Sequence, residues 1–122
     1  MSTSLGEQFA RALAVKDFGL IADLLHPEID FRGMTPSRNW EAARPDAVIG
    51  EILRSWFDDE DEIQALEQLE TGVVADRERV GYRFSVDNTK GSWIVEQQAY
   101  LSERDGRIGW MRVICSGFRP AA

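Results

Sequence analysis

The chain changes its hydrophobic pattern along its length, from a helical spacing in the first half to strand alternation in the second. A capping box opens at Ser4, and residues 5–15 then place apolar side chains three and four positions apart, which predicts a helix. Asp17 is expected to cap a second helix, which Pro27 ends. Residues 28–32 alternate between apolar and polar and predict a short strand.

The middle of the chain gives weaker signals. Residues 33–45 contain prolines and a glycine and predict a loop, longer than is usual in a compact domain. Asp46 is expected to cap a third helix whose apolar side chains begin at Val48. Residues 60–70 are rich in Glu, Gln, Ala and Leu, so local propensity favours a helix there.

Three alternating runs complete the chain, at residues 77–87, 92–102 and 107–119. They predict an antiparallel meander, with a tight turn at Asp105-Gly106 between the last two strands. Helices followed by strands indicate an α+β protein with helices on one side of a sheet. The length of 122 residues fits a single domain over residues 1–122.

Side chains alternate across a strand, so the last hairpin has two faces to assign. The first face is expected to line a cavity and combines Glu96, Gln98 and Tyr100 with Met111 and Cys115. The second is bulky and apolar, and monomers rarely expose such a patch. It is expected to contact a second copy of the chain through Trp93, Trp110, Ile114 and Phe118.

The net charge of −7 argues against nucleic acid and against anionic membrane surfaces as partners. The single cysteine allows no internal disulfide, and nothing indicates an oxidising compartment. No apolar run near the start is long enough for a signal peptide or a membrane span, so a cytoplasmic location is expected.

Two stretches, FARALAVKDFGLIADLLHPEIDF and DGRIGWMRV, resemble the opening and the last hairpin of the nuclear transport factor 2-like superfamily. The closer similarity is to its SnoaL-like and ketosteroid isomerase-like branch, and it covers nearly the whole chain. The resemblance implies a cone-shaped α+β barrel, in which three N-terminal helices close a curved mixed or antiparallel sheet over a small-molecule pocket. It also implies a strand near residues 62–74, against local propensity, and a homodimer formed through the outer sheet face.

The catalytic residues of the family's isomerases do not carry over. Their tyrosine on the first helix falls on Phe9, and their aspartate base falls near Phe31; a phenyl ring can neither donate to an oxyanion nor accept a proton. Asp30 is one residue away and is expected on the other face. The third acid of the family falls near Glu96 or Gln98, so steroid-type isomerisation is not expected.

Several side chains remain candidates for a site, each with a structural alternative. Glu96 is the candidate acid or base, or a structural acid paired with Arg83 or Arg112. His26 is a candidate pocket acid or base, or a cap at the end of the second helix. Trp40, Tyr82 and Tyr100 would line a pocket for a flat ligand, or belong to the core.

Other candidates have weaker signals. Gln98, Met111 and Cys115 complete the expected ligand-binding set, although a buried cysteine is usually a small inert apolar group. Arg32 and Arg38 would meet an anionic ligand or be solvated. A lone histidine makes a metal site improbable, and no cofactor is expected.

Three functions follow from these patterns. The first is a small-molecule-binding domain for a hydrophobic or aromatic ligand. The second is a cofactor-free isomerase, cyclase, dehydratase or hydrolase that uses Glu96. The third is a protein–protein interaction module. An open cavity containing Glu96 would favour the second, and an interior filled by side chains would favour the third.

Overall fold

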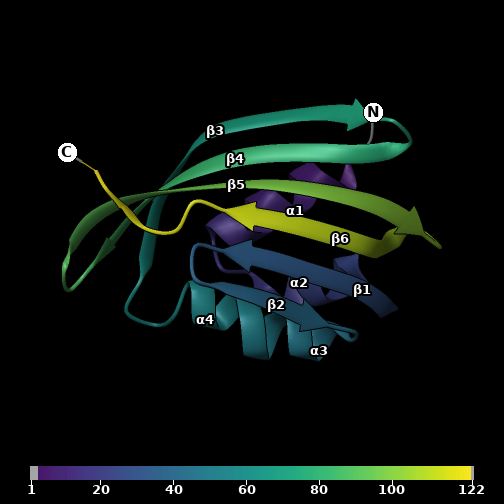
Figure 1. Cartoon of the computed structure of the whole chain (residues 1–122), viewed down its shortest axis with the longest axis horizontal. Coiled ribbons are helices and arrows are strands. Elements are labelled where there is room, and N and C mark those ends of the chain that lie inside the picture. The colour runs from purple at the N-terminus through teal and green to yellow at the C-terminus, as the bar shows by residue number, and fades with distance from the viewer. Residues whose placement is uncertain (1–2, 122) are drawn as a thin grey trace.

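The computed structural model describes residues 3–121 and shows helices covering one side of a seven-stranded mixed sheet (Figure 1). The helical elements are α1 (Leu5–Ala14), α2 (Phe18–Leu24), α3 (Pro45–Ala47), a π-helical stretch η1 (Val48–Leu53) and α4 (Arg54–Trp56). The strands are β1 (Leu25–Thr35), β2 (Arg38–Ala42), β3 (Glu62–Val74), β4 (Arg77–Asn88), β5 (Gly91–Arg104), β6 (Arg107–Cys115) and β7 (Arg119–Pro120).

The first two helices begin where the sequence predicts them. The hydroxyl of Ser4 accepts the Glu7 amide at 3.2 Å, and the Asp17 carboxylate accepts the Leu20 amide at 3.0 Å. Both side chains therefore satisfy amides that have no partner within their own helix. The apolar faces of α1 and α2 are buried and form one wall of the core.

Two local predictions are wrong. Residues 33–45 form a hairpin rather than a loop, because β1 continues to Thr35 and β2 pairs with it after a turn at Pro36-Ser37. Asp46 does not cap the third helix. It lies inside that helix, next to Pro45 in the first turn, and the N-cap position is Arg44 without a side-chain bond.

The sheet runs in the order β2-β1-β6-β5-β4-β3, and β7 adds to β5. Only the β1–β6 pair among these described neighbours is parallel; the others are antiparallel, so the predicted meander of β4, β5 and β6 is confirmed. Residues 62–74 form β3, which confirms the strand over the helix that local propensity favours. Pairing along β4 overrides that propensity.

A bulge in the β5–β6 hairpin determines which side chains share a face. Near the turn, Glu103 pairs with Ile108, but the next pair is Ser102 with Trp110, so Gly109 is an extra residue in β6. One extra residue reverses the alternation of every position beyond it. A Cβ atom at Gly109 would lie 2.5 Å from the Cβ of Arg104, so the bulge requires glycine.

The predicted composition of the two faces is therefore wrong. Met111 and Cys115 do face the helices, but Tyr100 pairs with Arg112 and Gln98 with Ile114, on the opposite, outer face. The core between sheet and helices is dense. Its largest fully buried side chains include Phe9, Phe31, Phe57, Phe84, Leu13 and Ile52.

Candidate functional site

A row of polar groups crosses the inner face of the sheet. Tyr82 in β4 pairs with Gln97 in β5, which pairs with Cys115 in β6, so the three side chains lie side by side. The Tyr82 hydroxyl donates to Gln97 Oε1 at 2.6 Å, and both residues are buried, at 3% and 1% exposure. Burial raises the pKa of Tyr82 well above its usual value, and Cys115 raises that pKa further. The tyrosine therefore stays a neutral donor.

One group of this row has no partner. The Gln97 amide nitrogen, Nε2, is buried and makes no hydrogen bond to any described residue. A buried amide without a partner costs about 1–3 kcal/mol, and such groups in native proteins call for an explanation. The row thus presents an unused hydrogen-bond donor inside an apolar interior.

A string of aromatic rings connects this row to the surface. Tyr82 packs on Phe84 at a centroid distance of 5.2 Å, and Phe84 packs on Phe57 at 5.7 Å. Phe118 follows at 6.0 Å from Phe57, and Trp93 lies 6.3 Å from Phe118. Phe118 and Trp93 are half-buried, so the outer end of the string reaches solvent.

The aromatic string also corrects the predicted dimer surface. Trp93 and Phe118 pack against the core, with the inner-face residues, and do not share a surface with Trp110 and Ile114. Trp110 and Ile114 do lie on the outer face. There Trp110 is held between two guanidinium groups, with Arg77 at 3.8 Å and Arg112 at 4.4 Å from its ring.

The carboxylate of Glu96 lies on the outer face, in an ion pair with Arg119, and its side chain is 42% exposed. It therefore does not line the interior, as the reversed alternation beyond the bulge requires. Gln98 is also outside and accepts from Arg79 at 3.0 Å. The structure thus separates Glu96, Gln98 and Tyr100 from Tyr82, Met111 and Cys115.

His26 is buried at the start of β1, beyond the end of α2. Its Nδ1 accepts the Glu28 amide at 3.0 Å, which places the ring proton on Nε2, next to the Asp105 carboxylate at 3.2 Å. These bonds join β1 to the β5–β6 turn. They give His26 a structural role that does not require the helix-capping geometry expected from the sequence.

Trp40 belongs to the inner side of β2. Its ring packs edge-on against Trp56 at 6.2 Å, and its Nε1 donates to Thr35 at 3.0 Å. Arg38 stacks over the same ring at 3.7 Å. This environment matches the core alternative for Trp40, although its backbone borders a pocket on the other side of the sheet.

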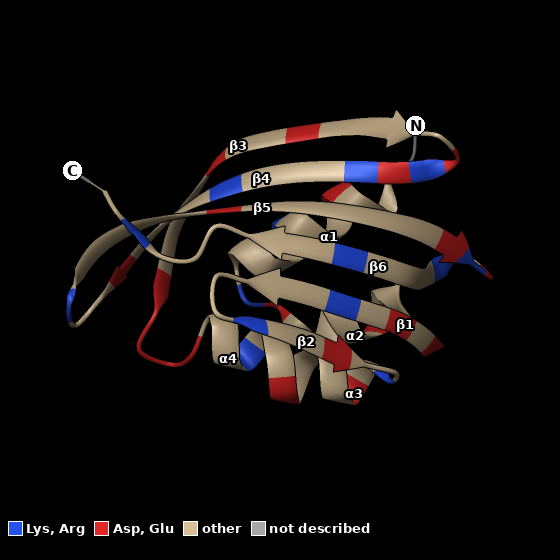
Figure 2. Ribbon diagram, in the orientation of Figure 1, with Lys and Arg blue, Asp and Glu red and all other residues tan. Residues whose placement is uncertain are grey.

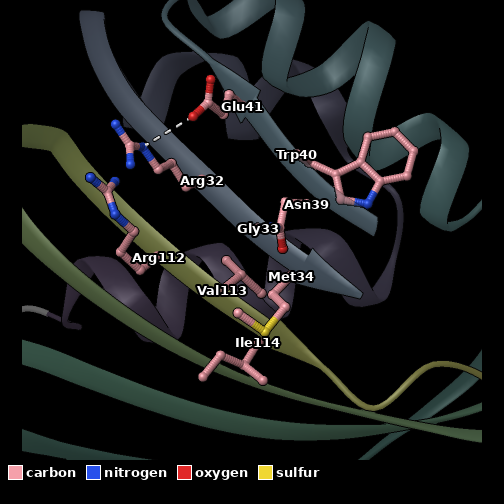
Figure 3. A pocket seen from close by; sticks show the side chains of 9 residues that line it. All are labelled: Arg32, Gly33, Met34, Asn39, Trp40, Glu41, Arg112, Val113 and Ile114. Atoms are coloured by element: carbon pink, nitrogen blue, oxygen red, sulfur yellow. Dashed lines mark ion pairs between the residues drawn. The ribbon is translucent and has the colours of Figure 1, made fainter. Parts of the chain in front are cut away.

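That pocket has a volume of about 360 Å³ and lies on the outer face, where β2, β1 and β6 run side by side (Figure 3). Its side chains form two groups, one charged and one mainly apolar. The charged group consists of Glu41, Arg32 and Arg112, and the mainly apolar group consists of Asn39, Met34 and Ile114. Pockets of 300–1,000 Å³ with an apolar floor and few polar groups are typical of small-molecule sites.

Sequence reasoning missed three important residues. Simple alternation along residues 92–102 puts Gln97 on the face of Trp93, away from the expected cavity, and nothing in the sequence marks Met34 or Arg112 as pocket residues. The one available signal was Gly109, because an isolated glycine within a strand pattern often marks a bulge. A bulge at Gly109 places Gln97 on the inner face, whereas Arg112 stays on the face of Trp110 and Ile114 in either case.

Within residues 3–121, no three His, Cys, Asp or Glu side chains lie close enough together to hold a metal ion. No helix in the same described range is long and apolar enough to cross a membrane.

Known proteins resemble this chain in their structures and not in their sequences. No family model matches the chain, and no curated protein matches it. A candidate isomerase from Rhodopseudomonas palustris superposes with a TM-score of 0.76 at 17% identity, covering 96% of this chain and 93% of that one. An LEH-like epoxide hydrolase from M. tuberculosis gives 0.65 at 13% identity, covering 92% and 80%.

A third solved structure is a protein with a ketosteroid isomerase-like fold from Catenulispora acidiphila, in complex with trimethylamine. It superposes with a TM-score of 0.68 at 10% identity and covers 95% of this chain and 88% of that one. The predicted cone-shaped α+β fold is therefore confirmed.

Proposed function

We propose that this chain, having the cone fold of the ketosteroid isomerase-like proteins, is a small-molecule-binding domain whose ligand enters the interior between sheet and helices. The observation that carries the proposal is the unpartnered Gln97 amide beside Tyr82. A ligand oxygen that accepts from Nε2 would remove the cost of leaving this donor buried and unpaired.

The surrounding side chains define the chemistry of the ligand. The Phe57 and Phe84 rings offer edges and faces to a flat molecule, and the Tyr82–Gln97 pair offers one fixed donor. We therefore expect a small, flat, mainly apolar compound with a single carbonyl-type acceptor. Proteins of this fold include a candidate isomerase, an LEH-like epoxide hydrolase and a protein in complex with trimethylamine, which is a small molecule.

Entry requires Phe118 to move, because its ring covers the aromatic string. Phe118 follows Gly117, which has a φ of +75°, a conformation that glycine adopts without the strain of other residues. The ring is only half-buried and belongs to the segment before the two-residue strand β7. The backbone on either side is tied to β5, so entry requires the Phe118 ring alone to turn away from Phe57 and Trp93.

The test compares two ligands that differ in one oxygen. 1-Indanone carries a carbonyl acceptor, and indane has the same ring system without it. We expect 1-indanone to bind about fivefold more tightly, as a hydrogen bond to a buried donor is worth on the order of 1 kcal/mol. Titration of amide shifts by NMR measures both affinities and maps them onto the inner face.

Matched variants assign the preference to one amide. Gln97→Met should remove the preference for 1-indanone, whereas Gln98→Met, on the outer face of the same strand, should leave it unchanged. Circular dichroism checks that both variants are folded. Equal affinities for the two ligands in the native protein, or a preference that survives Gln97→Met, would overturn the proposal.

The filled interior favours a second candidate, a protein–protein interaction module. The side chains between sheet and helices, Phe57 included, are almost completely buried. If neither ligand binds the native protein or a Phe118→Ala variant with an opened entrance, this second candidate is preferred.

Catalysis by Glu96 is not proposed, because its carboxylate lies on the outer face with Arg119. Two other expectations stay predictions. A homodimer through the outer face would now rest on Trp110 and Ile114, without Trp93 and Phe118. A cytoplasmic location likewise stays a prediction.

A further inference from the structure

The pocket on the outer face is built from two cross-strand rows. Arg32 in β1 pairs with Glu41 in β2 and with Arg112 in β6, which gives a charged row across three strands. Met34 pairs with Asn39 and with Ile114 in the same way, which gives a mainly apolar row two residues further along. Figure 3 shows the two guanidinium groups at one end of the pocket and the Met34 and Ile114 side chains at the other.

Residues beside the charged row hold Arg112 in a fixed position. Its Nη1 donates to the carbonyl oxygens of Asp30 and Met111, both at 3.0 Å, and lies 3.2 Å from the Asp30 carboxylate. Its guanidinium also packs on Trp110. All of these polar contacts use one nitrogen, so among residues 3–121 the Nε and Nη2 donors of Arg112 have no partner and can meet a ligand while Nη1 keeps its contacts.

Arg32 is held more loosely. Its Nε lies 3.6 Å from Glu41 and 4.0 Å from Asp30, distances of ion pairs rather than hydrogen bonds. Its side chain is 60% exposed. The five donors of this guanidinium can therefore turn toward a negative group in the pocket at little cost.

The two arginines of the pocket lie beside two carboxylates. The lining contains two arginines and one glutamate, and Asp30 lies next to both arginines, so these four side chains have no net charge. Figure 2 shows the basic segments of β1 and β6 side by side, with acidic segments of β1 and β2 next to them. Asp30 offsets the repulsion between the paired arginines, so a bound anion must use the donors that Asp30 and Glu41 leave open.

The apolar row supplies the other half of a site. Met34 and Ile114 are 53% and 52% exposed, which is unusual for large apolar side chains on neighbouring strands. Covering such side chains is favourable in proportion to the apolar area removed from water. Their backbone positions lie two residues, or roughly 6.6–6.8 Å, along the strands from those of the arginines. The Arg112 guanidinium leans the other way, toward Asp30 and Trp110, so a ligand that reaches both rows must be longer than this spacing.

We propose that this outer pocket binds a small organic monocarboxylate, with its carboxylate on Arg32 and Arg112 and its apolar body on Met34 and Ile114. This site is separate from the interior one, since the two lie on opposite faces of the sheet. A second copy of the chain is the competing occupant of the outer face. It does not explain why two adjacent arginines keep free donors above an apolar floor.

The test uses three compounds that share a ring and differ in charge: phenylacetate, 2-phenylethanol and 2-phenylethylammonium. Methyl-detected NMR follows the Met34 and Ile114 side chains, and isothermal titration calorimetry gives the affinities. We expect phenylacetate to bind at least about tenfold more tightly than the alcohol, because charge-assisted hydrogen bonds are the stronger kind. The ammonium compound should bind most weakly.

Variants locate the site and separate it from the interior. Arg112→Gln and Arg32→Gln should each weaken phenylacetate binding about tenfold or more, whereas Arg44→Gln, an exposed arginine outside the pocket, should not. Gln97→Met should leave phenylacetate binding unchanged, and Arg112→Gln should leave the 1-indanone preference unchanged. The two proposals can therefore fail independently.

Three results would overturn the inference. Equal affinity for phenylacetate and the alcohol would remove the role of charge. Unchanged affinity in Arg112→Gln and Arg32→Gln would place the anion elsewhere. Phenylacetate affinity that falls as sedimentation shows dimers forming would assign this face to a second copy of the chain.

Discussion

Replacing Gly109 by alanine tests the feature that determines both faces of the sheet. A Cβ atom at this position would lie 2.5 Å from the Cβ of Arg104, and 3.4 and 3.5 Å from the next carbons of that side chain. A Cβ atom is fixed to the backbone, so no change of rotamer can remove the first contact. The strands themselves must shift.

The expected cost follows from this geometry. Overpacking that forces a backbone shift costs about 1–3 kcal/mol, so we expect Gly109→Ala to lower the free energy of unfolding by about 2 kcal/mol. With a urea m-value of about 1–3 kcal/mol/M, the unfolding midpoint should fall by roughly 1 M. Gly50→Ala is the matched control. Its new Cβ would meet no atom within 4 Å, and alanine favours a helix over glycine, so stability should stay equal or rise.

A chemical readout distinguishes a strained bulge from a lost one. Cys115 is 9% exposed on the inner face, so its thiol should react slowly with Ellman's reagent in the native protein. If a larger variant, Gly109→Val, shifts the register by one residue, Cys115 moves to the outer face and should react rapidly while circular dichroism still shows a folded sheet. A Gly109→Ala protein as stable as the native one would refute the reasoning, because the close approach would then cost nothing.

Two further predictions concern the inner and the outer face. Burial holds the pKa of Tyr82 above its unfolded value of about 10. The stability that the neutral tyrosine contributes is therefore complete below about pH 10 and should decline as the pH rises further. Urea melts between about pH 9 and 11 should show this decline in the native protein and less of it in Tyr82→Phe. Glu96→Gln removes an exposed ion pair with Arg119, so it should change stability by less than about 1 kcal/mol and leave 1-indanone affinity unchanged. A more than tenfold loss of that affinity would restore Glu96 as a site residue.

The elements with local signals could be predicted from the sequence. Ser4 and Asp17 identify the helix starts because capping depends on residues a few positions apart. The hairpin of β1 and β2 could not be predicted in this way. Its two strands pair with each other across a short turn, but β1 is held in the sheet by β6, far along the chain, and Pro36 in the turn suggests a loop.

The candidate site was harder to predict, since it depends on the register between strands. The two-residue turn at Asp105-Gly106 implies that Tyr100 shares a face with Met111, and the bulge at Gly109 cancels this relation. Every β5 assignment beyond the bulge then changes side, so Glu96 lies outside and Gln97 inside. Among the candidates in the last hairpin, Met111 and Cys115 keep their predicted inner place because their face was assigned from β6 itself.

The bulge also explains how one hairpin supports two different surfaces. Without the extra residue, Gln97 and Leu101 would share a face with Trp110 and Arg112, and an arginine would enter the core without a partner for its charge. Burial of an unpaired charge costs several kcal/mol, far more than the strain of a glycine bulge. With the extra residue, Met111 and Cys115 complete the apolar interior, and Arg112 joins Arg32 outside. The polar row of Tyr82, Gln97 and Cys115 inside and the charged row outside therefore depend on the same glycine. Replacing Gly109 should impair the preferences for 1-indanone and for phenylacetate together, whereas Gln97→Met and Arg112→Gln should each impair only one of them.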